Sequence, residues 1–365
     1  MRHTVISRNL HKGHAEAKLT PSSTPPLFKE TVSGCFLNPT HDMTLTQLRL
    51  FTAIVDAGIN ITVAAKKVHA TQSGLSKQIK RLEDELGFLL FTRRARSLTA
   101  LTPEGLLVLE HARALLDHAT NIRALGANLR NDDQGELQIA TTHTQARHVL
   151  PSALSRLNKR FPSVAVHLAP GGDSESLARL KSGQTDIAII STGGARPDAD
   201  ITLPLYHWER LIVVPVQHRL NRLGRPIELT DLVHYPLVSY ESTRNPDSSL
   251  RRAFTAAGLT PNIAMTARDA DLIRTYVRRG LGVGIVAEMG SDELDTELAT
   301  LPAAGLFPTC TTWLLLRRDR LLRDHTVAFI HQLLPHLHAR DIKTLLNAET
   351  PEVPLVPYWR ELQHR

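Results

Sequence analysis

The sequence predicts an α+β multidomain protein with an N-terminal winged helix-turn-helix, a long linking helix and a two-lobed α/β domain. Three observations lead to this prediction. Apolar residues recur at helical spacing over residues 48–86, a helix-start signal lies at residues 102–104, and short strand patterns alternate with helical ones after Glu136. The length of 365 residues and the hydrophobic content of 42% allow two or three domains with substantial cores.

Residues 1–42 are a basic segment without sustained periodicity, and they contain the run PSSTPP at 21–26. We expect this extension to be disordered. Two alternatives remain open: Met43 is the true initiator, or the extension adds non-specific affinity for DNA.

The composition argues against membrane, disulfide and metal chemistry. No apolar run reaches 18 residues, and no signal-peptide segment is present. Cys35 and Cys310 lie far apart, so a structural disulfide is not expected. The cysteines and the 18 histidines show no metal-ligand spacing, so no metal or other cofactor is predicted. These observations indicate a cytoplasmic protein without a membrane partner.

Residues 43–101 carry the pattern of three helices that share one core. Thr71 suits the N-cap of the second helix of the motif, and a basic loop follows that helix. The residues expected to face away from the core suit base edges and phosphates in the major groove: Thr71, Gln72, Ser73, Ser76, Lys77, Lys80, Arg93, Arg94 and Arg96. The competing interpretation is a three-helix domain with a solvated basic face.

The charge distribution favours the DNA interpretation. Residues 43–101 hold nine Lys or Arg and four acids, whereas residues 102–365 hold 29 of each sign. The net charge of +7 therefore lies in the first 101 residues, where phosphate contacts need it.

Thr102, Pro103 and Glu104 provide a capping hydroxyl, a proline at the first helical position and an acid in the first turn. The helix should extend to about Leu129, within a segment that ends at residue 133. An apolar seam along it predicts self-association, with packing on its own domain as the alternative: Val108, Ala112, Leu115, Ala119, Ile122, Gly126 and Leu129.

The region from residue 134 to 340 alternates between strand and helix patterns. Strands are expected at 137–140, 164–168, 186–190, 211–216, 236–239, 263–267, 283–287 and 313–316. Helices are expected at 144–161, 174–181, 249–257, 270–279 and 325–337. This rhythm predicts mostly parallel sheets with helices on both faces, and the length of the region favours two lobes.

Polar side chains gather at the expected strand ends, where open α/β sheets bind ligands. The segment TTHTQAR at 141–147 places three threonines and a glutamine at a helix start, which suits an anion or a carboxylate. Ser191 and Thr192 end a second strand, and Ser239, Ser242 and Thr243 follow a third. Converging hydroxyls predict a small polar ligand, whereas each hydroxyl alone could be a simple helix cap.

Residues 43–101 resemble the DNA-binding domain of LysR-type transcriptional regulators. The strings TTHTQAR at 141–147, YHWER at 206–210 and ARDADLIRTYVRRGLGVGIVA at 267–287 are similar to the cysteine-regulon activators of the CysB/Cbl subgroup. The similarity covers nearly all of residues 43–340.

The resemblance implies a role for each part of the chain. Residues 72–86 would enter the major groove, 91–98 would form the wing, and 102–133 would form the dimerisation linker. Residues 134–340 would form a periplasmic-binding-protein-like (type II) effector domain with crossovers near 203–206 and 303–311. Its lobe I would comprise 136–204 and 308–340, its lobe II 205–307, and residues 341–365 would be a C-terminal tail.

The resemblance also implies ligand contacts. In the subgroup the TTHTQ segment binds sulfate or an inducer, a role that carries over to Thr142, Thr144 and Gln145. In the subgroup a threonine at the end of another strand also contributes to ligand binding. Ser191 occupies that position here and keeps the hydroxyl, and Trp208 would lie beside the pocket.

The loop at 241–246 departs from the subgroup. Its contributing threonine has two candidate counterparts, Thr243 and Asn245. Arg244 would strengthen anion binding, whereas Glu241 would oppose it.

The function implied is a sequence-specific regulator of sulfur assimilation and cysteine biosynthesis genes. It would bind double-stranded promoter DNA as a homodimer or homotetramer, under control of a small anion such as an acetylserine-type inducer, sulfate or adenosine phosphosulfate. The alternative is regulation of sulfonate or other organic-acid metabolism by a different inducer. An enzyme is not expected, because the sequence shows no nucleophile paired with a base at a spacing typical of a catalytic site. The candidate acid–base groups are His143, His148, His207, Asp269 and Asp271.

Overall fold

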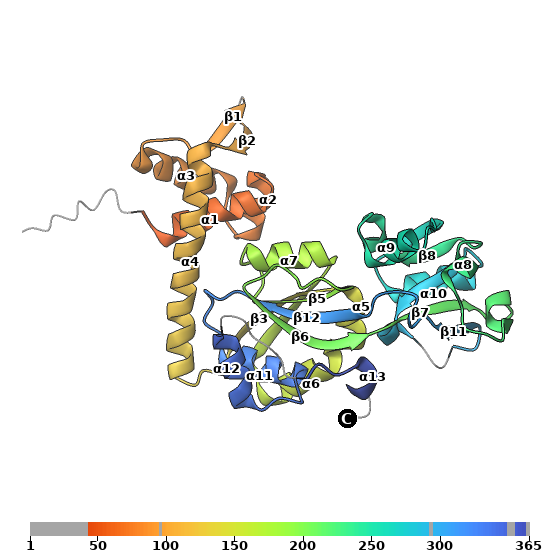
Figure 1. The fold of residues 1–365 in the computed structure, drawn as a ribbon. Helices are drawn as coiled ribbons and strands as arrows, with labels where there is room; N and C mark the ends of the chain where they lie inside the picture. The colour runs from red at the N-terminus through yellow and green to blue at the C-terminus, as the bar shows by residue number, and fades with distance from the viewer. Residues whose placement is uncertain (1–42, 95–96, 292–294, 349–354, 363–365) are drawn as a thin grey trace, which may run out of the picture. The chain divides into compact units, whose positions relative to one another are not determined.

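The computed structural model describes residues 43–94, 97–291, 295–348 and 355–362 (Figure 1). The expectations for residues 1–42 and for Arg96 lie outside this part of the chain. The described residues form a helical head, a long helix and two lobes, each lobe built on its own sheet.

The head contains three helices and a two-stranded wing. The helices are α1 (Leu45–Asp56), α2 (Ile61–Lys67) and α3 (Gln72–Leu86), and the wing strands are β1 (Phe91–Arg94) and β2 (Ser97–Leu101). This is the winged helix-turn-helix that the apolar spacing predicts.

The side chains of the head explain why these elements form. Phe51 of α1 and Phe91 of β1 meet edge to face with ring centroids 5.4 Å apart, and both are fully buried with Leu75 of α3. The Thr71 cap is confirmed, because its Oγ1 accepts the Gly74 N–H at 3.1 Å. The core and the cap together fix which face of α3 points outward.

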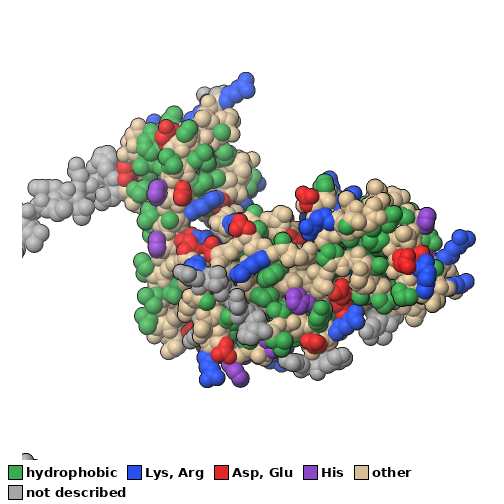
Figure 2. Space-filling view, in the orientation of Figure 1, with side chains coloured by type: hydrophobic (Ala, Val, Ile, Leu, Met, Phe, Trp, Pro, Cys, Tyr) green, Lys and Arg blue, Asp and Glu red, His purple; other side chains and the backbone are tan. Residues whose placement is uncertain are grey.

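Helix α4 (Pro103–Leu129) starts at the Thr102 cap, as predicted. At Val108 and Ala112 the seam follows the alternative expectation, because both residues pack into the head core and Ala112 is only 1% exposed. Among the large apolar side chains that remain exposed on α4, five recur at helical spacing and form what we call the α4 stripe: Leu107, Leu115, Ile122, Leu125 and Leu129. Hydrophobic side chains are visible along the outer side of the C-terminal half of α4 in Figure 2.

Lobe I is built on a five-stranded sheet of order β4-β3-β5-β12-β6. The strands are β3 (Gly135–Thr141), β4 (Val164–Pro170), β5 (Ile187–Thr192), β6 (Ile201–Trp208) and β12 (Cys310–Leu316). β3, β4 and β5 are parallel, whereas β12 runs antiparallel between β5 and β6. The carboxyl ends of the parallel strands therefore meet the beginning of β12 at one edge of the sheet.

Six helices belong to lobe I or follow it: α5 (His143–His148), α6 (Leu150–Arg160), α7 (Asp173–Lys181), α11 (Asp324–Leu333), α12 (Ala339–Asn347) and α13 (Trp359–Leu362). The expected helix at 144–161 is divided at Val149, because Pro151 lacks the N–H that a continuous helix would need. Within the segment expected as a tail, Ile342 is fully buried in the core of lobe I.

Lobe II is built on a sheet of order β11-β7-β10-β8-β9. The strands are β7 (Arg210–Pro215), β8 (Leu237–Tyr240), β9 (Ile263–Ala267), β10 (Val283–Ala287) and β11 (Leu298–Pro302). The helices are η1 (Arg219–Arg222), α8 (Leu229–Leu232), η2 (Glu241–Arg244), α9 (Ser249–Ala256), α10 (Ala270–Arg278) and η3 (Glu288–Gly290). β8, β9 and β10 are parallel, and β7 is antiparallel to both of its neighbours.

The first crossover between the lobes differs from the expectation. β6 pairs with β12 from Ile201 to Trp208, so the expected crossover at 203–206 lies inside a strand of lobe I. The chain passes to lobe II at Glu209, between β6 and β7. The sequence pattern missed β6 because it contains Pro204 and polar residues and is stabilised by distant pairing.

Candidate ligand cavity and nucleic-acid interface

A cavity of about 560 Å³ lies between the two lobes. The ends of β3, β4 and β5 border it from lobe I, and β8, η2 and α9 border it from lobe II. Its volume suits a small organic molecule. Its lining includes all six predicted ligand residues: Thr142, Thr144, Gln145, Ser191, Trp208 and Thr243.

The Gln145 side chain is held on both sides of its amide. Tyr206 Oη donates a hydrogen bond to Gln145 Oε1, and Gln145 Nε2 donates to Ser191 Oγ at 3.3 Å and to Thr312 Oγ1 at 3.2 Å. Burial raises the pKa of Tyr206, so its phenol remains a donor at neutral pH. Gln145 is 1% exposed and orders the neighbouring hydroxyls.

Hydroxyl groups supply the remaining donors on the lobe I side. Thr142 Oγ1 caps α5 by accepting the Gln145 N–H at 3.4 Å, which leaves its O–H free to donate. Ser191 Oγ lies 3.0 Å from Thr312 Oγ1, and Thr144, which is buried on α5, also lines the cavity. Such hydroxyls can donate to the oxygen atoms of an anion.

Thr243 and Trp208 use their polar atoms within the protein. Thr243 Oγ1 donates to the Tyr240 carbonyl at 2.7 Å, which holds η2 against β8. Trp208 Nε1 donates to Thr312 Oγ1 at 3.1 Å. Asn245, the second candidate in this loop, also lines the cavity. The geometry therefore makes Thr243 and Trp208 shape the wall with their apolar surfaces.

The charges expected in the loop at 241–246 lie at the rim. Glu241 is paired with Arg268 at 3.0 Å and lies 3.7 Å from Arg244. Arg244 itself is exposed to solvent. The negative charge of Glu241 is therefore balanced by neighbouring arginines.

Two further charges line the cavity, one from each lobe. Asp173 Oδ1 accepts the Ser191 N–H at 3.1 Å. Burial raises the pKa of Asp173 to about 6, although the hydrogen bond from Ser191 opposes the rise. Arg210 donates to Ser249 Oγ at 2.7 Å and to the Pro308 carbonyl at 3.2 Å. Neither side chain has an ion-pair partner among the described residues.

The C-terminal segment 355–362 contacts the crossover. The Trp359 ring lies 5.1 Å from the Tyr206 ring, and the His207 N–H donates to the Pro357 carbonyl at 2.9 Å. Arg360 pairs with Glu288 of lobe II, whose carboxylate also accepts the Glu209 N–H at 3.0 Å. This segment therefore supports Tyr206 and touches both lobes.

The outer face of α3 is available for a partner. Gln72, Ser73, Ser76, Lys77 and Lys80 are all exposed, as is Thr71 before them. Gln72 Nε2 donates to Thr62 Oγ1 of α2 at 3.0 Å, which ties together the two helices of the motif. Basic side chains, which the sequence identifies as arginines, also lie at the tip of the β1–β2 wing (Figure 2).

The two described wing arginines differ. Arg93 is paired with Glu83 of α3, whose side chain is only 3% exposed and also accepts the Leu90 N–H at 3.0 Å. Arg94 is exposed and makes no ion pair with a described residue. Arg93 therefore anchors the wing on α3, and Arg94 is the better candidate for a phosphate contact.

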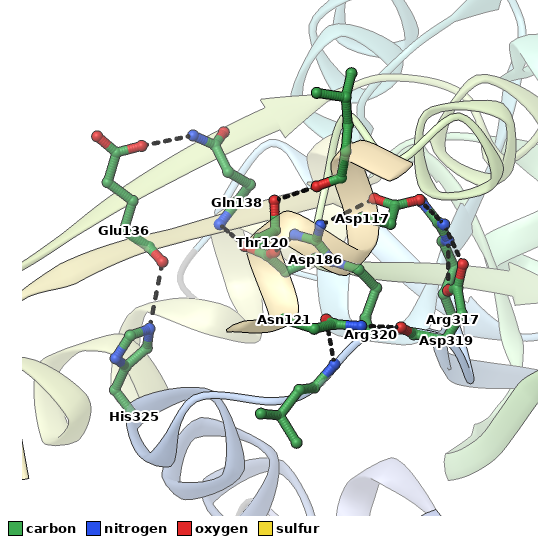
Figure 3. A network of polar contacts seen from close by, with 12 residues as sticks. Asp117, Thr120, Asn121, Glu136, Gln138, Asp186, Arg317, Asp319, Arg320 and His325 are labelled. Carbon is green, nitrogen blue, oxygen red and sulfur yellow. Dashed lines mark hydrogen bonds and ion pairs between the residues drawn. The ribbon is translucent and has the colours of Figure 1, made fainter. Parts of the chain in front are cut away.

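A polar network joins α4 to lobe I, as Figure 3 shows. Asp117 of α4 is paired with Arg317 and, at 3.1 Å, with Arg320. Arg320 also pairs with Asp186 at 3.0 Å. Asp186 directly precedes β5, and Arg317 directly follows β12. Both strands reach the cavity at their other ends, so they connect the cavity to α4.

Four residues that the structure brings to the candidate site were not predicted: Tyr206, Thr312, Asp173 and Arg210. Asp173 could have been found, since it follows an expected strand after two glycines, at the edge where ligands bind. Thr312 and Tyr206 carry no local signal. They reach Gln145 only because β12 pairs with both β5 and β6, each across more than a hundred residues of sequence.

Comparison with known proteins decides the family. Residues 45–106 match the bacterial regulatory helix-turn-helix protein, lysR family, and residues 130–338 match the LysR substrate binding domain. The chain belongs to the LysR family. This LysR-family chain is 39% identical to the HTH-type transcriptional regulator CysB of Haemophilus influenzae, over 81% of its own length and 91% of that protein.

Two further similarities place the LysR-family chain near the same group. It is 37% identical to the HTH-type transcriptional regulator SsuR of Burkholderia cenocepacia, over 83% of this chain and 99% of that one. The cofactor-binding domain of the Cbl transcriptional regulator matches 60% of this chain and 96% of its own length, with a TM-score of 0.53 and 34% identity. The chain is therefore a DNA-binding transcriptional regulator and not an enzyme. Within the described residues, none of the helices is long and apolar enough to cross a membrane.

Proposed function

We propose that this regulator controls genes of sulfur assimilation and cysteine biosynthesis, and that a small anionic ligand in the inter-lobe cavity sets its activity in the cytoplasm. The observation that carries the proposal is the convergence of Thr142, Thr144 and Ser191 on one cavity. Hydroxyl donors at strand ends suit sulfate, adenosine phosphosulfate or an acetylserine-type inducer. The similarity to CysB and Cbl supports the choice of regulon.

DNA binding would use α3 and the wing. Gln72, Ser73 and Ser76 suit base edges in the major groove, whereas Lys77, Lys80 and Arg94 suit phosphates. Pairing of two chains along the α4 stripe would present two such heads to a pseudo-palindromic promoter site. Ligand binding would change the position of the two heads relative to each other. The change would pass from the cavity through β5, β12 and the Asp117 network to α4.

Gel-shift assays with the sulfur-assimilation promoters of the source organism test the proposal. Retardation of these fragments above a scrambled control, and a change in affinity when ligand is added, are expected at physiological salt. Binding no tighter than to the scrambled fragment would count against the proposed regulon.

The second candidate function is regulation of sulfonate or other organic-acid metabolism. It is favoured by the loop at 241–246, which departs from the CysB/Cbl subgroup. Glu241 and its partners Arg244 and Arg268 place charged side chains on the lobe II rim there. Thermal-shift measurements with sulfate, adenosine phosphosulfate, acetylserine and a panel of sulfonates separate the two, since the preferred ligand should raise Tm the most.

A further inference from the structure

The Asp173 carboxylate occupies a central place in the cavity. The strand order is β4-β3-β5, and Asp173 follows β4, yet its Oδ1 reaches the Ser191 N–H of β5. Asp173 therefore extends across the carboxyl end of β3, where Thr142 begins a segment whose hydroxyl groups also line the cavity. A ligand bound to those hydroxyls lies next to this carboxylate.

Asp173 differs from the other acids that line the cavity. Glu241 is balanced by Arg268, and Asp247 is exposed to solvent. Asp173 is partly buried, and no hydrogen bond or ion pair from a described residue reaches its Oδ2. A shielded carboxylate without a cation is costly, and a positively charged partner removes that cost.

The complementary charge comes from lobe II. Arg210 stacks over Trp208 and Phe307, with its guanidinium carbon 5.9 and 5.6 Å from the ring centroids. Its hydrogen-bond acceptors among the described residues are a hydroxyl and a carbonyl. Its positive charge is therefore not neutralised by a described carboxylate. An anionic group of a ligand is the partner that it lacks.

From this arrangement we infer that the ligand is a zwitterion, an amino acid or aminosulfonate whose ammonium group faces Asp173 and whose anionic group faces Arg210. The inference rests on the proposed function, because it concerns the same cavity. A zwitterion of this kind bridges lobe I and lobe II, whereas inorganic sulfate would bring a second negative charge to Asp173. The cavity volume also suits an organic ligand better than a five-atom ion.

Calorimetric titration of the full-length protein near neutral pH tests the inference with matched ligand pairs. The pairs are taurine with ethanesulfonate, cysteate with 3-sulfopropanoate, and O-acetylserine with N-acetylserine. Each first member carries an ammonium group that the second lacks. The wild-type protein should bind the first members about tenfold or more tightly, the value of a hydrogen bond between charged groups.

Three variants test which residue causes the preference for ammonium-bearing ligands. Asp173→Asn keeps an oxygen for the Ser191 N–H and should abolish the preference while strengthening binding of the second members. Asp324→Asn removes an exposed acid of lobe I that does not line the cavity and should leave the preference unchanged. Arg210→Gln should weaken both members of each pair.

The inference is overturned if the wild-type protein shows no preference for the ammonium-bearing members, or if Asp173→Asn retains that preference. It is also overturned if none of the ammonium-bearing probes binds. Gel shifts on the same preparations keep the two proposals distinct, because promoter binding and a response to sulfate would persist if only the zwitterion assignment is wrong.

Discussion

The phenol of Tyr206 donates a hydrogen bond to Gln145 Oε1, and this contact orients the only amide side chain at the start of α5. Because Oε1 is occupied by a donor, Nε2 points to Ser191 and Thr312. Trp359 from the C-terminal segment packs on the Tyr206 ring. The cavity floor is therefore organised by residues that do not themselves need to contact the ligand.

Replacing Tyr206 with Phe should destabilise the protein and weaken ligand binding. The variant leaves the buried Gln145 Oε1 without its donor, which costs about 1–3 kcal/mol in the free energy of unfolding. Chemical denaturation measures this loss. Tyr276→Phe is the control, because Tyr276 is 40% exposed on lobe II. Equal stability of Tyr206→Phe and wild type would show that the contact contributes nothing.

Replacing Lys77 or Arg94 with Ala should weaken DNA binding at all sequences alike. Both side chains are exposed on the outer face of the head and suit phosphate contacts. Each variant should lower the slope of log affinity against log salt by about one. Lys159→Ala, an exposed change on α6 of lobe I, is the control. Unchanged affinity and slope in both head variants would rule out α3 and the wing as the DNA surface.

Placing a charge on the α4 stripe should prevent dimer formation. Ile122 and Leu129 are 72% and 76% exposed, and a dimer along the stripe would bury them. Ile122→Glu with Leu129→Glu should shift the protein from dimer to monomer in sedimentation experiments and reduce promoter affinity. Leu281→Glu, at a 41% exposed position on lobe II, should not. A dimer that survives the double change would assign self-association to another surface.

Replacing Asp117 with Asn should uncouple the cavity from α4. Asp117 is 14% exposed and joins Arg317 and Arg320, which continue to β12 and to Asp186 before β5 (Figure 3). The ratio of promoter affinities with and without ligand should fall by about 2- to 30-fold. Asp319→Asn, at a 51% exposed partner of Arg317, should have a smaller effect. If coupling survives in the Asp117 variant, the signal takes another route.

Local sequence patterns determined much of this protein. The caps at Thr71 and Thr102 and the apolar spacing of the head specify helix starts and faces, since these depend on neighbours a few residues away. The hydroxyls of the 141–147 segment and Ser191 were located because strand ends in α/β sheets are predictable binding positions.

Only the tertiary structure decided which of these side chains remain free. Contacts between distant segments bury Ala112 in the head core. Such contacts also pair Arg93 with Glu83 and hydrogen-bond Tyr206 to Gln145. Strand pairing over long sequence separations also placed Thr312 beside Gln145, and it left Asp173 without a cation. Local propensity acts over a few residues, whereas charge pairing and burial depend on the whole fold.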